Sequence, residues 1–184
     1  MTSEEILDLL KLVGKKLQKQ NIHGEVVICG GAVMCMQYNA RDNTDDIDGL
    51  YEPKTEMNEI IRQVADERNL DLKWFNNDVH HTINDFYKFR QTSVFFKKFG
   101  GLYIYTVKLE QMIAMKLYAF RTVEWKHDID DLNFLINKLR QNTEVTSDLL
   151  MLFCKDYGVA DKLKQSAIDF IDNIERVDRN VQDS

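Results

Sequence analysis

Residues 29–48, CGGAVMCMQYNARDNTDDID, constrain the fold of this chain more than any other stretch. The short, apolar and β-branched run at residues 25–29 predicts a buried strand that ends at Gly30 and Gly31. A short helical piece and a polar loop follow, and a second strand is predicted to begin with Asp46 and Asp48. An apolar strand, two glycines and a strand that opens with carboxylates together indicate a pocket for phosphates and a metal ion.

Alternation along the second strand predicts where its carboxylates point. Side chains two apart on a strand share a face and lie roughly 6.5–7 Å apart, so Asp46 and Asp48 should converge while Ile47 enters a core. Two carboxylates that close repel unless a cation lies between them, and Mg²⁺ is often held by one or two carboxylates, phosphates and water. Asp45 is expected to point away. The alternative is that Asp46 and Asp48 are solvent-facing residues of an edge strand.

The two glycines strengthen the interpretation of this stretch as a site. Gly30 and Gly31 permit a close approach to the backbone, and a helix that starts beside them directs amide groups at an anion. The alternative interpretation of the two glycines is an ordinary turn from strand to helix. Because Arg41 and Thr44 lie between the glycines and the Asp-x-Asp strand, we interpret the whole stretch as one pocket.

The remaining pattern predicts an α+β fold. A first helix is capped by Thr2 or Ser3, and further helices are expected near residues 57–68, 109–121, 126–139, 147–157 and 160–177. Strands are expected at residues 70–75, 93–99 and 102–107, the last two joined at Gly100 and Gly101. Residues 1–108 should form a mixed sheet flanked by helices, and residues 109–184 a C-terminal helical bundle packed on that core. The aromatic residues of the hairpin, Phe95, Phe96, Phe99, Tyr103 and Tyr105, are interpreted as strand core rather than as a base-stacking platform.

Composition excludes some classes of protein. The formal net charge of −6 does not suit a general nucleic-acid coat, which needs many cations on phosphates, although a local basic patch stays possible. The three cysteines form no Cys-x-x-Cys pair, which fits a reducing compartment. Without a signal-peptide pattern or an apolar run of about 20 residues, we expect a soluble, cytoplasmic protein that does not use a membrane.

A second charged group is predicted on the C-terminal helices. Lys116 lies on or beside the apolar stripe of its helix, where a lysine is costly unless it meets an anion or extends to water. Asp128 and Asp131 share a face at the start of the next helix, and Asp130 does not. These acids are also common at helix N-termini without any function. Arg121 either binds phosphate or pairs with this acidic cluster.

The pattern Gly-Gly, Arg and Thr-Asp-Asp-Ile-Asp resembles the signature of the nucleotidyltransferase superfamily, the fold of DNA polymerase beta and of minimal nucleotidyltransferases. It is most similar to the branch that contains the AbiEii-type toxins of toxin–antitoxin systems. Residues 109–135 resemble the downstream helical motif of the family, and LKWFNNDV resembles a Trp-x-Asn stretch of the same branch. The matches follow the order of the family across most of residues 28–135.

The resemblance implies a Mg²⁺ (or Mn²⁺) enzyme in which Asp46 and Asp48 are catalytic and bind the metal. It also implies a third carboxylate as general base; Asp71, Asp78 and Asp85 are candidates, and Asp71 is preferred because it falls in a predicted strand. The implied nucleotide-binding residues are Gly30, Gly31, Arg41, Thr44, Lys116, Arg121, Lys126, Asp128 and Asp131.

By resemblance, such an enzyme would transfer a nucleoside monophosphate from a nucleoside triphosphate to a hydroxyl or phosphate of a tRNA or protein, as a component of a toxin–antitoxin pair with a cognate partner protein. Because the third carboxylate is not clearly placed, a module that binds nucleotide or a partner with little turnover is the alternative. A protein that interacts through its C-terminal helices is a third hypothesis.

Overall fold

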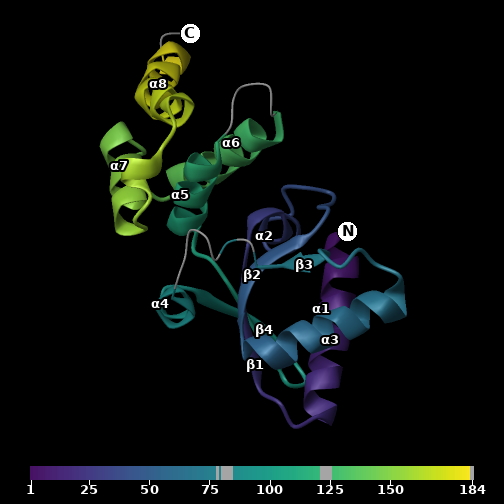
Figure 1. The fold of residues 1–184 in the computed structure, drawn as a ribbon. Coiled ribbons are helices and arrows are strands. Elements are labelled where there is room, and N and C mark those ends of the chain that lie inside the picture. The colour runs from purple at the N-terminus through teal and green to yellow at the C-terminus, as the bar shows by residue number, and fades with distance from the viewer. Residues whose placement is uncertain (78, 80–84, 121–125, 183–184) are drawn as a thin grey trace. The chain divides into compact units, whose positions relative to one another are not determined.

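A computed structural model describes residues 1–77, 79, 85–120 and 126–182, with the backbone alone for residues 126–127 and 175–182. The chain divides into two compact units, Met1–Lys108 and Leu109–Ser184. The first unit contains a sheet with helices, and the second is helical (Figure 1).

The first unit is built on a mixed sheet of five strands in the order β3-β2-β1-β5-β4. The strands are β1 (Gly24–Cys29), β2 (Ile47–Glu52), β3 (Phe75–Asn76), β4 (Val94–Phe99) and β5 (Leu102–Thr106). The central strand β1 is antiparallel to β2 and parallel to β5. The outer pairs are β2 with β3, which are parallel, and β5 with β4, which are antiparallel.

One face of the sheet is covered by α1 (Ser3–Lys19) and α3 (Lys54–Arg68). The α1 stripe of Ile6, Leu10, Val13 and Leu17 is fully buried, as the spacing of its apolar residues requires. A Cβ on Gly24 would meet Leu17 and Met57, so Gly24 marks the side of β1 that faces these helices. Thr2 caps α1 in a capping box with Glu5, which decides between the two predicted caps.

The opposite face of the sheet meets α4 (Phe86–Gln91), a helix that the sequence pattern did not predict. Asp85 caps α4, and Arg90 lies over the ring of Tyr105 at 3.0 Å from its centroid. Register places Asp48 of β2 opposite Cys29 of β1 and Asn76 of β3. Because side chains alternate along strands, these residues belong to the same face of the sheet as Tyr105.

The second unit contains α5 (Leu109–Ala119), α6 (Lys126–Arg140), α7 (Ser147–Asp156), the short 3₁₀ helix η2 (Ala160–Lys162) and α8 (Gln165–Gln182). Helix α5 packs against α6 and α7, and α7 packs against α8. Its core includes Met112, Leu117, Leu135, Phe153 and Ile171, all buried.

The predicted α+β class, a mixed sheet flanked by helices with C-terminal helices, is confirmed. Two element predictions are wrong. Residues 70–74 form a turn, and only Phe75–Asn76 pair as a strand. The helix predicted from residue 160 is interrupted at Leu163, whose ψ of 140° is extended, and α8 begins at Gln165. Among the helices of the described residues, none is long and apolar enough to span a bilayer.

Candidate functional site

The Asp-x-Asp segment alternates as predicted. Ile47 is fully buried in the core, and Asp46 and Asp48 on either side of it are half-buried. Asp45 is exposed. Asp46 directly precedes β2 and Asp48 is its second residue, so both carboxylates lie at the start of the strand. The alternative interpretation of Asp46 and Asp48 as residues of an edge strand is wrong for Asp48, because β2 lies between β1 and β3.

Gly30 places the backbone of the strand-to-helix turn directly against Asp48. Its φ is +66°, a left-handed conformation that favours glycine. A Cβ at this position would lie 2.7 Å from Asp48 Oδ2, which is closer than atoms pack. The Cys29 thiol, one residue earlier, donates to the Asp48 carbonyl oxygen at 3.5 Å. Glycine at residue 30 is therefore required by both the backbone and the carboxylate.

Gly31 makes a matching close approach to the loop before β2. A Cβ there would lie 2.3 Å from Thr44 Oγ1 and 3.6 Å from Arg41 Nη1. Thr44 is buried, and its backbone exchanges hydrogen bonds with Met1, a contact that sequence reasoning missed. The structure therefore brings Gly30, Gly31, Arg41, Thr44 and Asp48 together within the first unit.

Asn76 is a site residue that sequence reasoning did not single out. It lies opposite Asp48 in the β2–β3 pair, and its Nδ2 donates to Asp46 Oδ2 at 2.9 Å. The Ile47 amide donates to the Trp74 carbonyl oxygen at 2.8 Å, which holds β3 beside the carboxylates. The LKWFNNDV resemblance was the signal that could have found Asn76, since it marked this stretch without assigning the asparagine a role.

The candidates for a third carboxylate have other contacts. Asp71 is exposed in the turn before β3, and its Oδ1 accepts the Lys73 amide at 2.7 Å. Asp85 accepts the Lys88 amide at 3.1 Å as the cap of α4. Asp78 lies outside the described residues. The strand that motivated the choice of Asp71 is absent at residue 71. The role of Asp71 as a general base is still a prediction.

The second unit gathers Lys116 with two acids of α6. Lys116 Nζ lies 2.5 Å from Asp131 Oδ2 and 4.0 Å from Asp128 Oδ1. The Asp131 side chain is only 3% exposed and that of Lys116 13%, so this is a nearly buried ion pair. Asp130 is exposed, and the predicted shared face of Asp128 and Asp131 is confirmed. Arg121 and the side chain of Lys126 lie outside what the structure describes.

The α+β fold and the carboxylates beside a Gly-Gly turn are consistent with the nucleotidyltransferase class, and a family model identifies it. The chain belongs to the family described as "Nucleotidyltransferase of unknown function (DUF6036)", whose family model matches residues 4–150. That match covers nearly all of the first unit and residues 109–150 of the second, and it confirms that the chain is of the nucleotidyltransferase class. Searches among curated proteins and among solved structures found no match.

Proposed function

We propose that this chain is a Mg²⁺-dependent (or Mn²⁺-dependent) nucleotidyltransferase that moves a nucleoside monophosphate from a nucleoside triphosphate to a hydroxyl or phosphate of a tRNA or protein. The observation that carries the proposal is the close approach of Gly30 to Asp48 Oδ2, where a Cβ would lie at 2.7 Å. A Cβ at residue 30 would crowd this carboxylate, so the glycine keeps the backbone of the turn directly beside the acids proposed to bind the metal.

The residues present fit a divalent cation. Asp46 and Asp48 are half-buried carboxylates on the two sides of the buried Ile47, and Asn76 holds Asp46 Oδ2 through a neutral amide. Hard cations such as Mg²⁺ take oxygen ligands of this kind, together with substrate phosphates and water. When bound, the metal would supply activation of the attacking oxygen and neutralisation of the leaving pyrophosphate.

The other residues of the first unit would position the substrate. The backbone of Gly30 and Gly31, the Thr44 hydroxyl and the Arg41 guanidinium are proposed to face the triphosphate. The acceptor oxygen attacks the α-phosphorus, the bond to the bridging oxygen breaks, and pyrophosphate leaves with that electron pair. The proton of an acceptor hydroxyl goes to a base, for which Asp71 is still our candidate.

Five residues of the C-terminal helices are proposed to contribute to nucleotide binding, from resemblance to the superfamily: Lys116, Arg121, Lys126, Asp128 and Asp131. The nearly buried pair of Lys116 with Asp131 supports this proposal in part, because the contact with Asp131 fixes the orientation of the lysine side chain. We propose that Lys116 balances the charge of the triphosphate.

A weak nucleotide-binding or partner-binding module of the same fold is the second candidate. The position opposite Asp48 in β3 is Asn76 rather than an acid, and the Asp71 carboxylate accepts a backbone amide in its own turn. Without a third carboxylate in reach of the acceptor, the protein would bind nucleotide and transfer slowly.

Membership of the AbiEii-like branch, a toxin–antitoxin role with a cognate partner protein, and a cytoplasmic location are further parts of this proposal. The three cysteines are buried thiols that form no disulfide with one another, which suits a reducing compartment. Induced expression with and without the neighbouring gene tests the toxin role, since a toxin would arrest growth only when its antitoxin is missing.

Labelling with each α-³²P nucleoside triphosphate in the presence of tRNA or cell lysate tests the transfer. Asp46→Asn and Asp48→Asn should abolish Mg²⁺-dependent labelling and weaken Mg²⁺-dependent nucleotide binding in titration calorimetry. Asp45→Asn is the matched control, because Asp45 is adjacent but exposed, and it should keep full labelling. If all three variants label as the wild type does, the site proposal is wrong; binding without labelling in the wild type would favour the weak module.

A further inference from the structure

Asn76 connects two residues of the carboxylate site across the β2–β3 pair. It is the second residue of β3 and lies opposite Asp48 of β2. Its Nδ2 donates to Asp46 Oδ2 at 2.9 Å. An ionised carboxylate only accepts hydrogen bonds, so the amide presents its N–H group to Asp46 and not its oxygen. Asn76 therefore meets the Asp46 carboxylate as an uncharged donor.

The two carboxylates of the site are held by the sheet to different degrees. Asp48 is paired to β1 on one side and to β3 on the other. The ladder of β2 begins at Ile47, so Asp46 precedes the first paired residue. An aspartate side chain outside a ladder has several rotamers open to it unless a neighbour selects one. The hydrogen bond from Asn76 selects the orientation of the Asp46 carboxylate, and with it the direction in which Oδ1 points.

The two residues before Asn76 anchor it in the core. Trp74 and Phe75 are each 3% exposed. The indole Nε1 of Trp74 donates to the carbonyl oxygen of Ile61 in α3 at 3.3 Å, and the Phe75 ring meets Tyr51 edge to face at 5.4 Å. A donor on such a packed segment has a better defined position than a donor on a loop. Asn76 is therefore built into the fold as a fixed support for Asp46.

We propose that Asn76 is a positioning residue for the metal, which acts through Asp46 and does not contact the metal itself. Hydrogen-bond partners orient metal-binding carboxylates, and the loss of such a partner typically costs about 10- to 100-fold in metal affinity. An uncharged donor suits this task, because a lysine or arginine at residue 76 would repel a cation on the same carboxylate. The inference deepens the proposed function and rests on it, since it concerns the cation that Asp46 and Asp48 are proposed to hold.

A purely structural role is the competing explanation, in which the hydrogen bond only joins β3 to the residue before β2. Asn58 of α3 provides a matched control, because its Oδ1 accepts the Tyr51 hydroxyl at 2.6 Å. Tyr51 is three residues after Asp48 on β2, so its side chain belongs to the opposite face of the sheet. Asn58→Ala and Asn76→Ala thus each remove a hydrogen-bonded asparagine side chain from the first unit. A structural role predicts that both variants keep the wild-type metal affinity.

Mn²⁺ binding without nucleotide, followed by the signal of free Mn²⁺ in EPR spectroscopy, tests the inference. Asp46→Asn should weaken the binding, and Asn76→Ala should raise Kd by about 10- to 100-fold, whereas Asn58→Ala should keep the wild-type Kd. In the Asp46→Asn background, Asn76→Ala should have no further effect, because its partner is already altered. Circular dichroism checks that each variant is folded.

Asn76→Thr is a second variant, which serves as the test if Asn76→Ala does not fold. Threonine suits a strand, and its hydroxyl lies one bond closer to the backbone than the amide nitrogen of asparagine, so the contact with Asp46 is lost. The Kd for Mn²⁺ should therefore rise as it does in Asn76→Ala.

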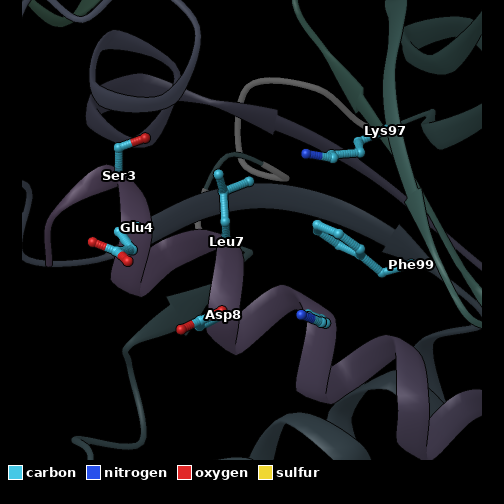
Figure 2. Close-up of a pocket in the computed structure, with 7 residues that line it drawn as sticks. Ser3, Glu4, Leu7, Asp8, Lys97 and Phe99 are labelled. Carbon is cyan, nitrogen blue, oxygen red and sulfur yellow. The ribbon is translucent and has the colours of Figure 1, made fainter.

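The metal titration needs a control for other acids of the first unit. Glu4 and Asp8 of α1 line a groove together with Lys11 of the same helix and Lys97 of β4 (Figure 2). Helix α1 covers the face of the sheet opposite to Asp48, so these acids are separate from the proposed metal site. Asp8→Asn should therefore leave the Kd for Mn²⁺ unchanged.

The outcomes separate this inference from the proposed function. If the Asn76 variants bind Mn²⁺ as the wild type does while Asp46→Asn binds it weakly, the positioning role is wrong and the metal site stands. If Asn76→Ala weakens binding just as much in the Asp46→Asn background, Asn76 acts independently of Asp46 and the positioning role is again wrong. A wild-type protein that binds no Mn²⁺, or binding that none of these variants changes, overturns both the inference and the metal site of the proposed function.

Discussion

Gly30→Ala is the substitution that tests the site most directly. The backbone at residue 30 has φ +66°, and an L-residue in this left-handed region costs about 1–2 kcal/mol. The added Cβ would also lie 2.7 Å from Asp48 Oδ2, whereas ordinary contact begins at 3.4 Å. The Asp48 carboxylate must therefore retreat by about 0.7 Å, or the turn must open by the same amount, and a misplacement near 1 Å costs about 100-fold in rate.

Gly158→Ala provides a control that separates backbone strain from the contact. Gly158 has nearly the same φ, +68°, and a Cβ there would meet nothing within 4 Å. Both alanine variants should therefore lose about 1–2 kcal/mol of stability from strain, and each should lower Tm by roughly several degrees. Only Gly30→Ala should also lose nucleotide transfer, by about 100-fold.

Thermal melts followed by circular dichroism and the labelling assay with saturating nucleotide measure the two effects. At temperatures well below the Tm of each variant, nearly all of the protein is folded. A lower transfer rate under these conditions therefore reflects a change in the site and not a loss of folded protein. If Gly30→Ala transfers nucleotide as fast as the wild type, the position of Asp48 does not matter for the chemistry. If both glycine variants lose activity alike, instability rather than the contact explains the loss.

Two further predictions concern the second unit. Lys116→Met and Asp131→Asn should each destabilise this unit by about 3–5 kcal/mol, since each leaves a nearly buried partner unpaired. In urea unfolding, the double variant should lose less stability than the sum of the two single losses. Strict additivity of the losses would show that the two residues are not coupled. Burial raises the pKa of the Cys154 thiol from 9.0 to about 11. Between these values the unfolded chain releases the thiol proton and the folded chain keeps it, so the free energy of unfolding should fall as pH rises from 9 toward 11. Cys154→Ala should flatten that slope, and an unchanged slope would assign it to other groups.

Sequence reasoning located the parts of the site that are local in the chain. The stretch of 19 consecutive residues from Gly30 to Asp48 contains most of them. The alternation of side chains along a strand is enough to place Asp48 and Ile47 on opposite faces of the sheet. Asn76 was missed, because its contact with Asp46 spans 30 residues. Strand register across such a separation is set by tertiary packing, and a single sequence does not show it.

The strand predicted at residues 70–75 failed for a local reason. Its alternation matched a half-buried strand, but Asp71 accepts the Lys73 amide and the Trp74 amide donates to the Asp71 carbonyl oxygen. Asp and Asn often form such turns because their side chains reach their own backbone. Leu72, which the pattern assigned to the strand, is 65% exposed as a result.

Phe95 shows why the edge of a sheet is hard to predict. Its run of aromatic residues looks like a buried strand, yet β4 is an edge strand, Phe95 is 55% exposed, and the register shifts between Phe95 and Lys97. A shift of one residue moves the following side chains to the other face, so alternation counted from Phe95 assigns Lys97 and Lys98 wrongly. Lys98 shares the face of Tyr103 only because of this shift.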